Sequence, residues 1–376
     1  MKFQQKVCAA FYGVAIGDGM GAPVEGKSPE EIKQLFAKHD FSTFLPPTHG
    51  EDPGQGKGYG RITDDTLMTE ALLYAYEHAQ KHMDSYDYAT HMIPYIAEHS
   101  MFVPEWQCDM PILNRLAWPE KYPFFRLRIA NAEPRIAGQG NCVNCGVAMY
   151  MLPIGVVNAG NPNGAYAEAA QFGSAHNESF ALEAGAVMAA AYAAAFSSDA
   201  TVDSVIKAAC VLAKDGTSQA LQATLAVAKQ RLTLEAFLPA LRQAILPFDP
   251  HVMHFADHLE NQTVALADDG QPSRKNAIEE MPVALAIFAW AQGDFSKALE
   301  AGVRYGRDCD SIASMACGLC GALKGFENIP QDLIQQSDAI NHRNFGMLGN
   351  RLVTVALHIA KQTKQSLQKH WEIFDC

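Results

Sequence analysis

The sequence has no run of lysine or arginine residues and is poor in basic residues overall. Its 376 residues include 29 Lys and Arg against 41 Asp and Glu, which gives a formal net charge of -12. Such a charge repels phosphate backbones and anionic membrane surfaces. We therefore expect neither a nucleic acid nor a membrane to be the partner of this protein.

Long hydrophobic runs are also missing. The longest uncharged apolar stretch, residues 184–196, is mostly alanine and is shorter than the roughly 20 residues that a transmembrane helix requires. The first residues contain no apolar signal core. Because 48% of the residues are hydrophobic, the chain can still bury a core, which excludes global disorder. We expect a cytoplasmic protein without a membrane-spanning helix.

Alternating strand patterns and Ser/Gly/Pro linkers are scarce, whereas helical patterns extend along the chain. Ser28-Pro29-Glu30-Glu31 forms a capping box with proline at the first helical position, and residues 63–66 begin a second helix. Further helices are predicted at 178–197, 202–214, 219–230, 233–245, 275–291, 295–304, 309–325 and 350–369. The sequence thus predicts an all-α fold, a helical bundle forming a single domain over residues 1–376.

Two segments interrupt the helical pattern. Residues 41–62 are rich in glycine and proline and predict a long loop that leads to Thr63. Residues 100–145 read as irregular and contain several aromatic residues and, among others, the arginines Arg126, Arg128 and Arg135. Long irregular segments are often functional, so this one either contacts substrate or forms a surface excursion packed by its own aromatics.

The nine cysteines do not form a convincing zinc pattern. Two C-x-x-C pairs occur, Cys142 with Cys145 and Cys317 with Cys320, but they are far apart in the chain. The second pair lies in an alanine- and glycine-rich helical run, where cysteine acts as a small apolar residue. A histidine stripe, His251, His254 and His258, is likewise better explained as a surface feature than as a metal site.

Two acidic clusters stand where loops enter helices. Asp64 and Asp65 point about 100° apart on a helix, so they can serve two different ions, and Asp308 and Asp310 lie two residues apart. With the hydroxyls of Thr63 and Ser311 they form an all-oxygen ligand set that suits Mg²⁺ or Mn²⁺. By spacing alone, these residues could also be ordinary N-terminal charges favoured by the helix dipole.

Several segments in a fixed order resemble the ADP-ribosylglycohydrolase family, of the dinitrogenase-reductase-activating glycohydrolase type. The resemblance extends from residue 8 to about residue 330. Its segments are residues 13–25, Thr63-Asp64-Asp65-Thr66, residues 146–155 with His176, residues 306–313, residues 318–325 and Ile329-Pro330.

This resemblance implies an all-α orthogonal bundle that cleaves the C1″ bond of an ADP-ribosyl group through a binuclear Mg²⁺ (or Mn²⁺) centre. The substrate would be an ADP-ribosylated protein or a small ribosylated molecule. The general base would be Glu25 or one of the pair Asp64 and Asp65, a choice that the sequence leaves open. The implied metal ligands are Thr63, Asp64, Asp65, Asp308, Asp310 and Ser311, and the implied substrate-binding residues are Asp18, Asn144, Cys145, Gly146, His176 and Arg307.

The departures from the family pattern concentrate where substrate should bind. Cys145 stands at an asparagine position and Tyr150 at an arginine position, while Arg307 and Cys309 replace glycine and threonine. Arg307 adds a cation that could meet a phosphate or point to solvent. Two alternatives therefore stay open: a nucleoside or phosphoribosyl N-glycosidase with the same grip on ribose, and a non-catalytic, crystallin-like relative.

Overall fold

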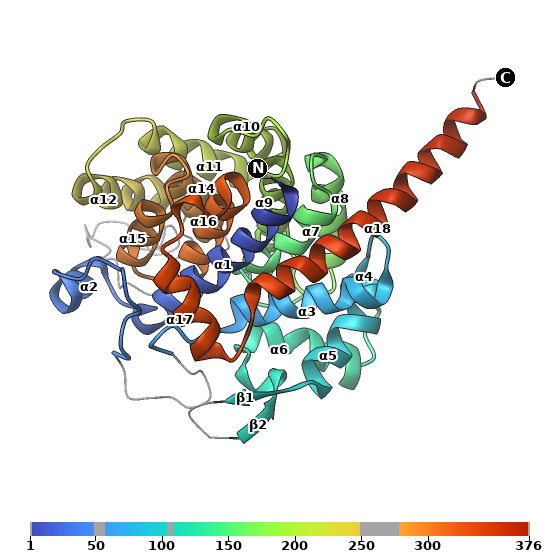
Figure 1. Cartoon of the computed structure of the whole chain (residues 1–376), viewed down its shortest axis with the longest axis horizontal. Coiled ribbons are helices and arrows are strands. Elements are labelled where there is room, and N and C mark those ends of the chain that lie inside the picture. Colours follow the sequence, from blue (N-terminus) through green and yellow to red (C-terminus); the bar gives the residue numbers. More distant parts are fainter. Residues whose placement is uncertain (1, 49–56, 104–107, 249–277, 375–376) are drawn as a thin grey trace, which may run out of the picture.

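The computed structural model describes residues 2–48, 57–103, 108–248 and 278–374, and within them the all-α prediction is confirmed (Figure 1). The helices are α1 (Phe3–Gly21), α2 (Pro29–Phe36), α3 (Asp64–Ala79), α4 (Ser85–Asp87), α5 (Ile93–Glu98), α6 (Trp118–Phe124), α7 (Leu152–Val157), α8 (Pro162–Gly173), α9 (Ser179–Ala195), α10 (Val202–Leu212), α11 (Asp215–Ala228), α12 (Leu234–Ile245), α14 (Glu280–Trp290), α15 (Phe295–Tyr305), α16 (Cys309–Lys324), α17 (Gln331–Asn341) and α18 (Phe345–Glu372). The histidine stripe at 251–258 lies outside the described residues.

Helices α1 and α16 pack together more extensively than any other pair of described elements. The sequence allows this because α1 presents glycine every fourth residue, at positions 13, 17 and 21. A Cβ atom on Gly17 would lie 2.5 Å from the backbone of Ala313, and one on Gly21 would lie 2.5 Å from the Cα of Asp310. The two backbones are therefore in direct contact, which brings Asp18 of α1 close to the start of α16.

The segment Phe3–Val24, which contains α1, is long and apolar enough to cross a membrane by length and composition. Its most apolar window is entirely buried inside the protein. Because α1 packs against α16, α18 and α15, its apolar character is explained by its place in the core of the bundle.

The capping motif read from the sequence agrees with the start of a helix in the structure. Ser28 Oγ accepts a hydrogen bond from the Glu31 amide at 3.3 Å, and Glu31 Oε2 accepts one from the Ser28 amide at 2.8 Å, so the predicted capping box is present at α2. Gly306 connects α15 to α16 with a φ of 73°, in the left-handed region that favours glycine. A Cβ there would also lie 2.3 Å from the Lys27 carbonyl oxygen.

The region predicted as irregular, residues 100–145, contains more structure than its sequence indicated. Strands β1 (Ser100–Val103) and β2 (Cys108–Pro111) form an antiparallel hairpin in which Met101 pairs with Met110. Helix α6 and several short helical turns follow. Strands of four residues are too short to show a clear alternation of polar and apolar side chains, which is why the sequence did not predict them.

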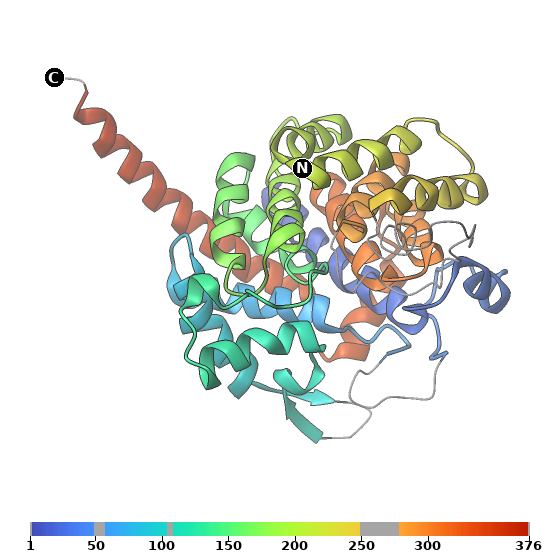
Figure 2. The same cartoon turned by 180° about the vertical axis from the view of Figure 1, so that it is seen from behind.

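The last helix, α18, is longer than the predicted 350–369. Its first half packs on α1, α7 and α3, and its second half extends away from the body of the protein to the C-terminus (Figures 1 and 2).

Candidate active site

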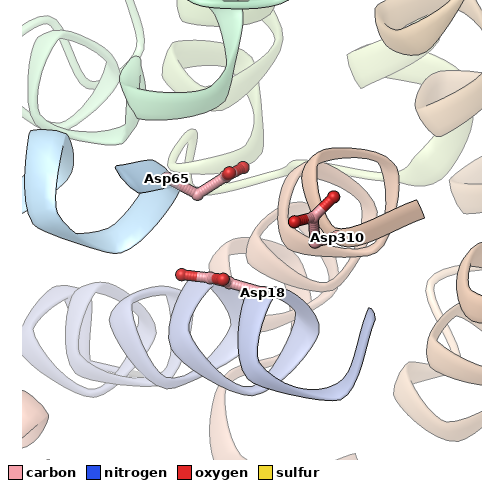
Figure 3. Close-up of side chains that lie close together, drawn as sticks. All are labelled: Asp18, Asp65 and Asp310. Atoms are coloured by element: carbon pink, nitrogen blue, oxygen red, sulfur yellow. The ribbon is translucent and has the colours of Figure 1, made fainter. Parts of the chain in front are cut away.

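Three buried aspartates from three different helices converge beside the α1–α16 contact. Asp18 comes from the last turn of α1, Asp65 from the first turn of α3 and Asp310 from the first turn of α16, and their side chains point toward a common space (Figure 3). One carboxylate oxygen of each lies within 4.8 Å of the others. Glu25, Asp308 and Asp310 form a second such group, so Asp310 belongs to both.

Asp18 acts mainly as an anchor for the start of α3. Its carboxylate accepts hydrogen bonds from the Thr63 amide at 2.9 Å, the Thr63 hydroxyl at 2.8 Å and the Thr66 hydroxyl at 2.5 Å. Burial raises the pKa of Asp18 to about 6, although these hydrogen bonds favour its ionised form. Asp18 is fully buried and does not line the pocket described below, which corrects the expectation that it binds substrate.

Asp65 and Asp310 have the environment of cation ligands. Each is buried, and the Oδ1 atom of each has no hydrogen-bond partner among the described residues. Burial, followed by the neighbouring carboxylates, raises the pKa of both groups well above the usual value. Buried polar atoms are almost always paired, so unpartnered oxygens on two neighbouring buried carboxylates fit a hard divalent cation.

The other predicted ligands surround this group. Ser311 Oγ donates to Asp65 Oδ2 at 3.3 Å. Asp64 also lines the pocket, and its Oδ2 accepts a hydrogen bond from the Ala117 amide at 3.2 Å. Glu25 is half-buried and forms an ion pair with Lys57. The structure therefore brings both acidic motifs and Glu25 to one place, as the sequence predicted.

These residues line a pocket of about 420 Å³, a volume that is typical of small-molecule sites. Of the predicted site residues, it is lined by Glu25, Thr63, Asp64, Asp65, Asn144, Cys145, Asp308, Asp310 and Ser311. The wall also includes Lys57, Arg115, Ala117, Trp118, Pro119, Cys142 and Met149.

Two further carboxylates in the pocket wall, Glu120 and Glu280, were not predicted. Both are buried, and Oε2 of each has no hydrogen-bond partner among the described residues. Burial is the main cause that raises the pKa of each, followed by Asp64 for Glu120 and by Asp308 for Glu280. Each stands in the first turn of its helix, α6 or α14, which was the available signal, but that signal is common to many surface glutamates.

The predicted substrate loop is split between the pocket and the layer behind it. Asn144 and Cys145 line the pocket, and Cys145 Sγ donates to Asp308 Oδ2 at 3.0 Å. Burial and the Asp308 charge raise the pKa of this thiol well above its usual range. Gly146 lies behind the wall, where a Cβ atom would approach Glu120 Oε1 to 2.8 Å, so a glycine is required for Glu120 to sit there.

His176 does not reach the pocket, contrary to the expectation that it binds substrate. It is fully buried, its Nδ1 lies 2.8 Å from the Tyr150 hydroxyl, and its Nε2 is 3.9 Å from Glu120 Oε1. Burial lowers the pKa of His176 to about 4, so the imidazole is neutral at physiological pH. His176 therefore lies in the layer behind the pocket wall, next to Glu120.

Arg307 requires the largest correction, because it neither lines the pocket nor points to solvent. It is 3% exposed and forms a bidentate pair with Glu279, Nε to Oε1 at 2.6 Å and Nη2 to Oε2 at 3.0 Å. Its backbone carbonyl accepts a hydrogen bond from the Gly26 amide at 2.7 Å. Arg307 therefore ties the loop of Glu25 to the start of α16 instead of contacting substrate.

The cysteines of the two C-x-x-C pairs lie apart. Cys142 and Cys145 border the pocket, whereas Cys317 and Cys320 are buried within α16. The described cysteines are free thiols, and none belongs to the two acidic groups above.

The protein is an all-α bundle in which several helices place carboxylates at one pocket. The chain belongs to the ADP-ribosylglycohydrolase family, whose model matches residues 1–366. It is similar to Uncharacterized protein YegU of Escherichia coli (strain K12), with 24% identity over 93% of this chain and 96% of that protein. An uncharacterized protein of Archaeoglobus fulgidus (strain ATCC 49558 / DSM 4304 / JCM 9628 / NBRC 100126 / VC-16) is 23% identical over 96% of this chain and 100% of its own length.

The fold has a counterpart among solved structures. A chain described as "ADP-ribosylglycohydrolase-related protein complex" superposes with a TM-score of 0.51 and 20% identity, covering 94% of this chain and 99% of that one. The resemblance drawn from the sequence motifs is confirmed.

Proposed function

We propose that this protein is a metal-dependent glycohydrolase that cleaves the C1″ bond of ADP-ribosyl groups on a protein or small-molecule acceptor in the cytoplasm. Membership of a glycohydrolase family supports the reaction class. The observation that carries the proposal is the set of buried, unpartnered carboxylate oxygens of Asp65 and Asp310 at a pocket of about 420 Å³.

The acidic groups suit two divalent ions, Mg²⁺ or alternatively Mn²⁺. Asp18, Asp65 and Asp310 would hold one ion, and Asp308 and Asp310 the other, with Glu25, Asp64 and the hydroxyls of Thr63 and Ser311 next to them. Bound divalent ions supply positive charge that polarises ribose oxygens and acidifies water.

Glu25 is the best-placed general base of the candidates that the sequence left open. It lines the pocket and is only half-buried, so water can reach its carboxylate. Asp65 is enclosed, and Asp64, which is also half-buried, accepts a hydrogen bond from the Ala117 amide through its Oδ2. We infer that Glu25 accepts a proton from the attacking water as the C1″ bond breaks.

Trp118 supplies an apolar surface at the same pocket. It lines the pocket, is 58% exposed, and its ring lies 5.5 Å from that of Phe125. Such a surface suits stacking of a nucleobase. We infer that the adenine end of the substrate lies over Trp118.

An activity assay tests the proposal. The protein is incubated with ADP-ribosylated peptides in Mg²⁺, and free ADP-ribose is measured by mass spectrometry. We expect release of ADP-ribose that stops with EDTA and in Asp310→Asn. No release from any ADP-ribosylated peptide or small molecule, with the metal bound, would contradict the proposal.

A second candidate is an N-glycosidase acting on nucleosides or phosphoribosyl compounds. It is favoured by the scarcity of cations in the described pocket wall, where Lys57 pairs with Glu25 and the Arg115 guanidinium donates to the Ile62 carbonyl at 2.9 Å. A diphosphate would find few cationic partners there. The same assay with nucleosides and ribosyl phosphates, scored for free base, separates this activity from the first.

A further inference from the structure

The second half of α18 forms an arm, residues 357–374, that projects from the body of the protein (Figures 1 and 2). From residue 360 to residue 374 every side chain is exposed. The family match ends at residue 366, so the distal part of the arm lies beyond the region that this chain shares with the family model. Residues 357–366 of the arm therefore lie within the family match, and residues 367–374 lie beyond it.

Apolar residues recur along one face of the arm with alternating steps of three and four. The face is made of Leu357, Ala360, Lys364, Leu367, Trp371 and Phe374. Alternating steps of three and four are the a/d pattern of a coiled-coil seam, in which Lys364 is the one polar member. Val353, a buried residue of the body, lies four residues before Leu357 and therefore belongs to the same pattern.

This seam has no cover in the described structure. The exposed fractions are 61% for Leu357, 54% for Leu367, 64% for Trp371 and 66% for Phe374. Most helical stability in proteins comes from packing an apolar face against another element, and burying large apolar side chains is favourable. A partner helix along the seam would therefore stabilise the arm considerably.

We propose that the arm pairs with the arm of a second copy of this chain, antiparallel, to form a dimer. The steps of the seam read 3, 4, 3, 4, 3, which is the same in both directions. A two-fold axis between residues 364 and 367 therefore sets every seam residue opposite another. Leu357 then faces Phe374 of the second copy, Ala360 faces Trp371, and Lys364 faces Leu367.

Size and charge both favour this antiparallel register. It matches the smallest seam residue, Ala360, with the largest, Trp371, and it lets the aliphatic part of Lys364 lie on Leu367. A parallel pair would instead set Lys364 against Lys364, Ala360 against Ala360 and Trp371 against Trp371. Like charges at the seam repel, and two facing alanines leave a gap.

The net charge of the molecule also favours a second copy. The arm has three lysines, Lys361, Lys364 and Lys369, and one acidic residue within its bounds, Glu372, while the whole chain has a net charge of -12. In the antiparallel pair the tip of each basic arm lies beside the acidic body of the other copy. That attraction offsets part of the repulsion between two negatively charged molecules.

Sedimentation equilibrium of the full-length protein tests the proposal. We expect a reversible dimer, which Trp371→Glu weakens by at least about tenfold, because it removes the largest apolar seam residue and sets a charge against Ala360 of the second copy. Gln365→Glu is the matched control, because it adds the same charge to the same exposed helix away from the seam and should leave the dimer intact. A monomer at all concentrations, an assembly larger than a dimer, or an unchanged dimer in Trp371→Glu would overturn the proposal.

A size-exchange pair tests the register. Ala360→Trp sets two tryptophans against each other and Trp371→Ala leaves a gap, so each should weaken the dimer, whereas the double variant should restore it. The two positions are three turns apart on one helix, so rescue must act between copies. Failure of the double variant to restore the dimer would overturn the antiparallel register, and circular dichroism checks that each variant is folded.

Discussion

The Sγ of Cys145 lies 3.0 Å from Oδ2 of Asp308, at the edge of the second acidic group. A neutral thiol is a poor ligand for Mg²⁺, whereas an amide oxygen is a good one. This contact sets a thiol where the family motif has an asparagine.

We predict that Cys145→Asn increases Mg²⁺ affinity by about three- to tenfold, because the new amide oxygen replaces the thiol beside Asp308. Calorimetric titration with Mg²⁺ measures the change. Cys142→Asn is the control, since Cys142 lines the same pocket, whereas it is the Cys145 thiol that contacts Asp308 and Ser311. Equal Mg²⁺ affinity of the wild type and Cys145→Asn would show that no ion binds within reach of the thiol.

Asp310→Asn should weaken Mg²⁺ binding by at least roughly 100-fold and abolish turnover, because Asp310 belongs to both acidic groups. The fold should persist, since the amide has the same shape and removes one of several crowded negative charges. Calorimetry, the activity assay and circular dichroism report these three effects. Asp332→Asn, at an exposed position of α17, should change none of them. Full Mg²⁺ affinity in Asp310→Asn would contradict our assignment of the ligands.

The stability of the metal-free protein should depend on pH through the acidic cluster. The pKa of Asp18 in the folded protein is about 6, above its ordinary value of 3.8, and burial raises those of Asp65 and Asp310 well above the same value. The folded state therefore binds more protons than the unfolded state between the two pKa values. These groups lower the free energy of unfolding as the pH rises through that window.

His176 contributes to the free energy of unfolding in the opposite direction. Its pKa in the folded protein is about 4, below the ordinary value of 6.5, so its stabilising contribution falls as the pH drops from 6.5 to 4.

The comparison of wild type with Asp65→Asn isolates the effect of the acidic cluster. Urea unfolding in EDTA should show that the substitution stabilises the protein at pH 7.5 and has less effect at pH 4.5. The same effect at both pH values would contradict the raised pKa of Asp65. Mg²⁺ at pH 7.5 should stabilise the wild type more than Asp65→Asn.

Arg307→Ala should lower the free energy of unfolding by about 3 kcal/mol, because it leaves the buried carboxylate of Glu279 without its bidentate partner. In the double variant Arg307→Met/Glu279→Gln the loss should be smaller than the sum of the single losses. Urea unfolding measures each value, and Arg135→Ala, which breaks an exposed pair with Glu133, should cost less than about 1 kcal/mol.

The substrate KM provides a separate test of the same pair. If Arg307 bound a phosphate of the substrate, Arg307→Lys would raise KM sharply. We expect little change in KM, because the guanidinium faces Glu279 behind the pocket.

Features that depend on a few neighbouring residues could be predicted from the sequence. Helical periodicity and the capping box at Ser28 identified an all-α fold, and the two acidic motifs, around Asp64 and Asp308, identified the helix starts that meet at the pocket. Glycine at every fourth position of α1 already encodes the close approach of α16. Such signals are local because backbone hydrogen bonding and capping involve residues at most four positions apart.

Only the tertiary structure decided which polar groups face the pocket and which support it from behind. Glu120 and Glu280 line the pocket. In contrast, Arg307 contacts buried Glu279, and His176 contacts buried Tyr150. The burial of a charged side chain depends on the elements packed around it from distant parts of the chain, and its partner is fixed by that packing. A residue's motif can therefore be read from the sequence, but its partner and its access to solvent follow from the fold.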